Sequence, residues 1–355
     1  MNKTKGEIMN NFKKIGLTAL AGSLAAVSAN AAEMSVSGET TVSYISNTAE
    51  KVNTIGGSSI GTSTGITFSG SGELENGWTV SSSNILNDGD ANALSSSQLN
   101  LTMGSMGTVT FAKLFGTNVN AIDDVTPKVA EEAFDGAGGS VLQGIGSTTA
   151  KGAVAYKSPT FDIAGISASF GVDYDPAAGA AGNDHDAVAT KTATQGSGHG
   201  FTVKLAHESG LTVGAGQENV NSNSGNDAEA ENTTAYALYT MGPVSVGYQG
   251  YYLNNGTQAI AGSTAAGADY SGDAMSIAFN VNDQVSIGYQ KISEDKESYT
   301  STAGVTRDIK SLSAAYSTGG MTMSIQQTDT DNYSMAAAGS ELDTETVQVT
   351  LSFAF

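Results

Sequence analysis

The sequence contains no cysteine among its 355 residues. A disulfide framework, a thiolate metal site and a cysteine nucleophile are therefore excluded. Basic residues are also few, because 15 Lys and Arg stand against 35 Asp and Glu, and the formal net charge is −20. Nucleic acid is not expected as a partner, since its phosphates require a basic surface.

Apolar residues are scarce as well. They make up 39% of the chain, whereas glycine alone accounts for 44 residues. An acidic chain with so little apolar content is often disordered. Here, however, Val, Ile, Phe and Tyr occupy alternate positions over long stretches, which favours β-strands. We expect one domain, from residue 33 to residue 355.

The sequence also lacks an apolar run of the roughly 20 residues that a membrane-spanning helix requires. The longest candidate, residues 15–27, follows Lys13 and Lys14 and ends near the small residues Ala29-Asn30-Ala31. This order predicts a secretory signal peptide over residues 1–32, with Met1 or Met9 as the initiator; a retained anchor is the alternative that the short run disfavours. Its removal would leave 11 basic and 34 acidic residues, a net charge of −23.

The rest of the chain falls into segments of about ten residues in which apolar and small polar side chains alternate. In the last segment Val347, Val349 and Leu351 alternate with Gln348 and Thr350. Short connections with turn residues alternate with longer ones rich in Gly, Ser, Asn and Asp. The pattern predicts an all-β fold, a transmembrane up-and-down antiparallel β-barrel of about 16 strands. The strand at Met34 would pair with the strand ending at Phe355, so that no edge stays open.

Other folds predict different patterns. A soluble β-sandwich rarely needs so many consecutive hairpins, and a calcium-binding solenoid would show G-G-x-G-x-D repeats that are absent. A secreted or surface-layer acidic β-rich adhesion or structural protein is the main alternative from another class.

No catalytic constellation is apparent, so we do not expect an enzyme. No cofactor or metal is expected, although acidic segments such as Asn183–Asp186 and Asn87–Asp90 could bind Ca²⁺ weakly. The three histidines, His185, His199 and His207, lack the spacing of a metal site.

Three segments resemble the general bacterial porins, particularly the alphaproteobacterial branch with sixteen strands and a trimeric assembly. They are Glu33–Glu39, the terminal Leu351–Phe355, and the long connection of about residues 116–150. The resemblance implies a water-filled channel through which small hydrophilic solutes and ions diffuse across the cell outer membrane; a substrate-selective channel is the alternative within the same fold. It also implies outer-membrane lipid around a homotrimer, and Phe355 as part of the signal read by the barrel-assembly machinery.

The resemblance further implies that the segment of about residues 116–150 folds into the barrel and narrows the pore; an acidic loop that stays outside is the alternative. Its acidic residues are Asp123, Asp124, Glu131, Glu132 and Asp135. By the alternation of side chains, Lys157 and Lys204 face the lumen, and we expect them to form a basic wall opposite this loop. Arg307, the only arginine, is expected in an external loop, so the arginine cluster usual in the family is missing. With acids in excess, a mild cation preference is expected.

Overall fold

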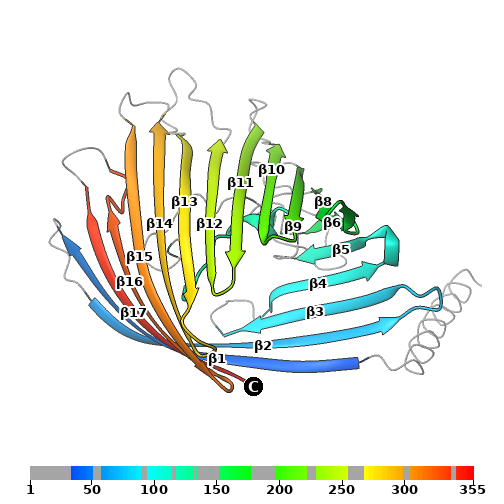
Figure 1. Cartoon of the computed structure of the whole chain (residues 1–355), viewed down its shortest axis with the longest axis horizontal. Helices are drawn as coiled ribbons and strands as arrows, with labels where there is room; N and C mark the ends of the chain where they lie inside the picture. The colour runs from blue at the N-terminus through cyan, green and yellow to red at the C-terminus, as the bar shows by residue number, and fades with distance from the viewer. Residues whose placement is uncertain are drawn as a thin grey trace, which may run out of the picture.

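The computed structural model of the chain forms one β-sheet that curves into a ring (Figure 1). It describes residues 33–50, 57–88, 94–113, 117–131, 133, 145, 152–176, 197–221, 229–254, 268–298, 304–336 and 341–355. The predicted signal peptide lies outside these residues. No helix in the described part of the chain is long and apolar enough to cross a membrane.

The sheet has seventeen strands. They are β1 (Glu33–Glu50), β2 (Gly57–Glu73), β3 (Thr79–Asn87), β4 (Leu94–Thr102), β5 (Thr108–Lys113), β6 (Ala153–Lys157), β7 (Phe161–Ile163), β8 (Ile166–Asp175), β9 (Gly198–His207), β10 (Leu211–Asn221), β11 (Glu229–Met241), β12 (Val244–Asn254), β13 (Ala268–Asn280), β14 (Val285–Ser298), β15 (Val305–Thr318), β16 (Met321–Asp331) and β17 (Asp343–Ala354). Two 3₁₀ turns, η2 (Gly104–Met106) and η3 (Asn120–Ile122), lie between strands.

The ring is closed by its first and last strands. β1 and β17 pair antiparallel, from Glu39 opposite Ala354 to Glu50 opposite Asp343. At the end of this seam the amide of Gly38 donates to the carbonyl of Phe355 at 2.7 Å, and the amide of Phe355 donates back to Gly38 at 2.9 Å. The sheet therefore closes on itself, and the predicted antiparallel barrel is confirmed.

The strand count also agrees with the prediction, because β6 and β7 together make one crossing. Both pair with β8, and they are separated only by Ser158, Pro159 and Thr160. Pro159 has no amide hydrogen and cannot donate to the ladder, so the strand is interrupted there. Ser158 bridges the gap, since its hydroxyl accepts a hydrogen bond from the Phe170 amide at 3.0 Å. The barrel therefore has sixteen crossings.

The two ends of the barrel differ. At one end, the turn end, adjacent strands are joined by short turns, and both β1 and β17 have their chain termini there. The predicted turns at Gly77, Gly210 and Gly242 each have glycine at positive φ. One turn escaped the sequence interpretation: Ala164 and Gly165 join β7 to β8, with φ of 52° and 82°. Two positive φ values in a two-residue connection fit the twist of a hairpin. The longer connections meet at the opposite end, the loop end.

Side chains alternate between the two faces of the sheet as predicted. In β8, Ile166, Phe170 and Val172 are exposed on the outer face, while Asp173 and Asp175 are buried inside. The inner face is mostly polar, but not everywhere. On the inner side of β12–β15 a small apolar cluster is present, which a uniformly polar lumen does not predict. Its members are Ala133, Tyr251, Leu253, Ala274, Ile292 and Ile309, with Tyr270 packed against them.

Candidate functional site: a segment inside the barrel

The segment after β5 runs along the inner face of the barrel. Figure 1 shows it, in teal, within the curve of the strands. Its described residues, 117–131 and 133, hydrogen-bond to inward side chains of four strands, β8, β12, β14 and β16. The expectation that this connection folds inward instead of remaining outside is met for these residues. We call residues 117–131 the inner loop.

The first attachment point is Asp173 of β8, whose side chain is fully buried. Its carboxylate accepts hydrogen bonds from the backbone amide of Asn118 at 3.0 Å, from the Asn118 side chain at 2.7 Å and from the amide of Val119 at 2.8 Å. Hydrogen bonds to an ionised acceptor are stronger than neutral ones. The start of the inner loop is therefore held at one point of the wall.

Glutamine side chains hold the remainder. Gln249 of β12, also fully buried, donates to the carbonyl of Ile122 at 2.8 Å and accepts from the amide of Val125 at 3.1 Å. Gln290 of β14 accepts from the amide of Ala133 at 3.0 Å, and Gln326 of β16 donates to the carbonyl of Glu131 at 2.8 Å. Each amide supplies the partner that an irregular backbone inside the barrel needs. The loop thus has a fixed path along the wall.

Glycines in the strands make room for this path. At five inward positions, an added Cβ would lie within 3 Å of a loop side chain, closer than such atoms approach in proteins. The pairs are Gly171 with Asn118, Gly200 with Val119, Gly216 with Ile122, Gly247 with Pro127, and Gly288 with Val129. Glycine inside a strand often marks the close approach of another backbone. The five glycines form a shallow track in which the loop lies.

The predicted acidic residues are only partly placed. Asp123 and Asp124 lie half-buried just after η3, and Glu131 is exposed; Glu132 and Asp135 lie outside the described residues. Asp124 forms an ion pair with Lys128 at 3.4 Å. Burial raises the pKa of Asp123 to about 6, and repulsion from Asp124 adds to the rise. Burial also raises the pKa of Asp124, against the attraction of Lys128.

The predicted basic residues are near the inner loop, on the same wall. Lys157 of β6 and Lys204 of β9 line one cavity together with Asn118 and Val125 of the loop. They therefore lie beside the start of the loop. The sequence predicted them on the opposite wall, across the lumen from the loop. The reason for the difference is that the loop lies along the wall from β8 to β16 instead of crossing the channel. Among the described lumen-facing side chains of β1–β5, on the far wall, none is cationic.

Arg307 differs from the sequence prediction. It lies in β15, not in an external loop, and its side chain is buried on the inner face. Its guanidinium forms an ion pair with the fully buried Glu294 of β14 and donates to the carbonyl of Tyr333 at 3.1 Å. The strands here continue past the lipid-facing part of the barrel, where polar residues occupy both faces, so the apolar alternation no longer marks them.

Phe355 lies at the seam of the barrel. Besides its backbone hydrogen bonds to Gly38, its ring packs over that glycine, where an added Cβ would clash with it. The C-terminal residue therefore completes the closure of the ring.

Within the described residues no group of three His, Asp or Glu side chains is arranged to hold a metal ion. Asn183–Asp186 lies outside those residues, and so does part of Asn87–Asp90.

A closed sixteen-crossing barrel with an apolar outer face and a loop on its inner wall is the architecture of an outer-membrane channel. The family model described as Gram-negative porin matches residues 16–299. The chain belongs to this family, and its place is the outer membrane. A search of curated proteins gives no match.

Several solved structures have the same fold. OmpF of Salmonella typhi, in complex with daunomycin, is similar with a TM-score of 0.64 and 15% identity, covering 92% of this chain and 98% of that one. An anion-selective porin from Comamonas acidovorans has a TM-score of 0.62 at 15% identity, covering 92% and 100%. OmpT of Vibrio cholerae, in a trimer form, has a TM-score of 0.62 at 12% identity, also covering 92% and 100%.

Proposed function

We propose that this channel is a general porin: small hydrophilic solutes and ions diffuse through it passively, with a mild preference for cations. The observation that carries the proposal is the inner loop, which occupies part of the lumen at a fixed position. Selection then needs no catalytic group, because pore size and the charges on the lining decide what passes. The narrowest part would be bounded by the inner loop on one side and by hydroxyl and amide side chains of β1–β5 on the other.

The cation preference rests on the balance of charge around this passage. The loop carries Asp123, Asp124 and Glu131 and one cation, Lys128, which is paired with Asp124. Lys157 and Lys204 lie on the turn side of the loop. The far wall offers no described cation to oppose the carboxylates. The chain without its predicted signal peptide has a net charge of −23. Carboxylates lining a narrow aqueous passage attract cations and repel anions.

The test is electrical. The refolded protein is inserted into a planar bilayer, and single-channel conductance and the reversal potential under a KCl gradient are measured. We expect stable open channels and a reversal potential of the sign given by K⁺ permeating faster than Cl⁻. An absence of conductance would contradict the porin proposal, whereas clear anion selectivity would contradict only the cation preference.

The preference should also depend on pH. Because burial raises the pKa of Asp123 to about 6, its carboxyl is charged above this pH and neutral below it. Lowering the pH from about 8 to about 5 should therefore reduce the cation preference. The midpoint should lie near pH 6. Reversal potentials measured across this range check the result. In Asp123→Asn the step near pH 6 should disappear, and a step that persists would assign it to another group.

The outer face of β1–β4 favours a homotrimer. On the other strands this face is mostly apolar toward the turn end, but here Thr40 and Thr64 are 3.3 Å apart, and Asn84 accepts a hydrogen bond from Ser97 at 2.8 Å. Both pairs lie on the side of the sheet that carries the exposed Phe68 and Leu99. Polar groups facing hydrocarbon are unfavourable, so contact with a neighbouring barrel would suit them better than lipid. OmpT of Vibrio cholerae has a trimer form, which agrees with this assembly.

The remaining parts of the proposal concern maturation and partners. Residues 1–32 would direct export and be removed, leaving a mature chain that begins at Glu33. The terminal strand with Phe355 would be read by the barrel-assembly machinery, and outer-membrane lipid would surround the assembled trimer. No cofactor is proposed, and weak Ca²⁺ binding by the acidic loops remains a prediction.

A further inference from the structure

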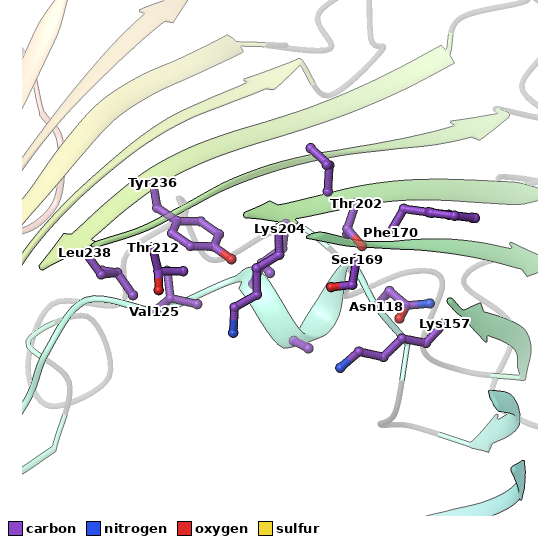
Figure 2. A pocket seen from close by; sticks show the side chains of 13 residues that line it. Asn118, Val125, Lys157, Ser169, Phe170, Thr202, Lys204, Thr212, Tyr236 and Leu238 are labelled. Carbon is purple, nitrogen blue, oxygen red and sulfur yellow. The ribbon is translucent and has the colours of Figure 1, made fainter. Parts of the chain in front are cut away.

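A cavity of about 170 Å³ lies between the wall and the inner loop. Figure 2 shows its lining: Lys157, Ser169 and Lys204 come from β6, β8 and β9, and Tyr236 comes from β11. The turn η3 and Val125 of the inner loop form its other side. Lys204 lies opposite Ser169 and Gly214 of the two neighbouring strands. Both positions are one inward residue nearer the turn end than Gly171 and Gly216, against which Asn118 and Ile122 pack. The cavity therefore lies beneath the loop, on the side of the turns.

Two lysines give this cavity positive charge. Lys157 lies opposite Gly171 of β8, and Lys204 lies opposite Ser169, two residues earlier in the same strand. Standard strand spacings place the two lysine Cα atoms roughly 12 Å apart, so their long side chains can reach one anion between them. Both side chains are exposed, and neither has an ion pair or a hydrogen bond within the described part of the chain. Figure 2 shows both lysine side chains beside the loop ribbon, with their ammonium groups directed toward the lower part of the view.

Hydroxyl groups add neutral donors. Tyr236 is only 6% exposed, because its ring fills the space over Gly214. Its ring is buried, whereas its hydroxyl faces the cavity and can donate a hydrogen bond there. Ser169 and Thr212 bring further hydroxyls to the same cavity. A ligand that accepts hydrogen bonds would satisfy these groups.

The other half of the lining is apolar. Ile122, Val125 and Leu238 contribute methyl groups beside the polar donors. A cavity of about 150 Å³ with apolar walls is large enough to hold benzene. The space here is of similar size, but its rim carries two positive charges. Its chemistry therefore differs from that of the acidic loop above it, and it suits a molecule with an apolar body and an anionic group.

We propose that this cavity is a weak binding site for small organic carboxylates with a compact apolar body, of the size of benzoate. The carboxylate lies between Lys157 and Lys204 and accepts a hydrogen bond from Tyr236, and the apolar body contacts Ile122, Val125 and Leu238. The inference rests on the proposed channel function, and it names one class of solute that the passage retains briefly. Binding is in the millimolar range, because a site within a conducting pore must release its ligand readily.

The experiment measures the current through single channels in KCl while benzoate is added. We expect a concentration-dependent reduction of the K⁺ current that saturates. Acetate, which lacks the apolar body, and benzyl alcohol, which lacks the charge, should each have an effect at least about tenfold weaker, since acetate loses the apolar contacts and benzyl alcohol loses the charge-assisted hydrogen bonds. If acetate reduces the current as strongly as benzoate, the apolar half of the site is wrong; if benzyl alcohol does, the lysines are irrelevant.

Lysine substitutions test whether benzoate reduces the current by binding in this cavity. In Lys157→Met with Lys204→Met the benzoate effect should weaken about tenfold, while Lys204→Arg should keep it. Lys291→Met is the matched control, because Lys291 is exposed on the outer face of β14, and it should respond to benzoate as the unaltered protein does. An unchanged benzoate effect in the double variant would overturn the proposal. KCl conductance in the absence of benzoate separates this outcome from failure of the channel itself.

Discussion

Replacing Asp123, Asp124, Glu131 and Glu132 together by Asn and Gln should abolish most of the cation preference and leave the barrel folded. A unit charge about 7 Å from a passing ion contributes roughly 0.6 kcal/mol in water, before screening by salt. Four such charges change the ratio of K⁺ to Cl⁻ permeability severalfold. The barrel survives because the loop is held through backbone groups of Val119, Ile122 and Val125, which these substitutions leave in place. Reversal potentials under a KCl gradient measure the effect.

A matched variant removes the same number of charges from the outside. Asp295, Glu297, Asp329 and Glu345 are exposed near the loop end of the outer face, and their amides should leave the preference nearly unchanged, because the barrel wall and water separate them from the lumen. Heat-modifiable migration on a denaturing gel verifies that each variant is folded. If both quadruple variants have the same reversal potential as the unaltered channel, the inner loop does not line the constriction.

Arg307→Ala should destabilise the barrel strongly. It would leave the carboxylate of Glu294, which is fully buried, without the guanidinium that neutralises it. Removing one partner of a buried ion pair costs about 3–5 kcal/mol. Urea unfolding of the refolded barrel in detergent measures the loss. The double variant Arg307→Met with Glu294→Gln should recover much of the stability, because no buried charge is left.

The control is an ion pair of the same kind on the surface. Lys310 of β15 and Asp331 of β16 are 3.4 Å apart, and both are largely exposed. Lys310→Ala should cost no more than about 1 kcal/mol, since water already solvates both charges. Equal losses for Lys310→Ala and Arg307→Ala would mean that the Glu294 carboxylate is hydrated, which contradicts its burial.

The sequence predicted the barrel well, because alternation in lipid-facing strands is a direct consequence of having hydrocarbon on one side and water on the other. The prediction failed where a strand no longer has hydrocarbon on one side and water on the other. Arg307 lies in a strand whose two faces are both polar at that point, and in the turn Ala164-Gly165 an alanine stands at a positive φ where Asn, Asp or Gly is usual. Pro159 divides one crossing into two strands and shifts the alternation by one residue, because Lys157 lies opposite the inward Gly171 whereas Phe161 lies opposite the outward Ala168. Both pieces pair with β8, so the count of sixteen was unaffected.

The attachment of the inner loop could not be read from the sequence in the same way. Gln249, Gln290 and Gln326 each follow an outward Tyr or Ile, as any water-lining glutamine could, and only the structure shows that they bind the loop backbone. The glycines were a usable signal. Gly171 and Gly247 stand at inward positions in the middle of strands, where glycine is unfavourable without a reason. The two lysines were placed on the correct face, but their distance from the loop depends on the path that the loop follows.

The track of five glycines determines how close the inner loop lies to the barrel wall. At each of these positions one extra carbon atom would have to push the loop away from the wall and toward the axis. No charge would change and no strand pairing would be lost, so the diameter could shift while the field along the passage stayed the same. The strand glycines therefore influence the size of solute that passes, whereas the carboxylates of the inner loop influence which ions pass.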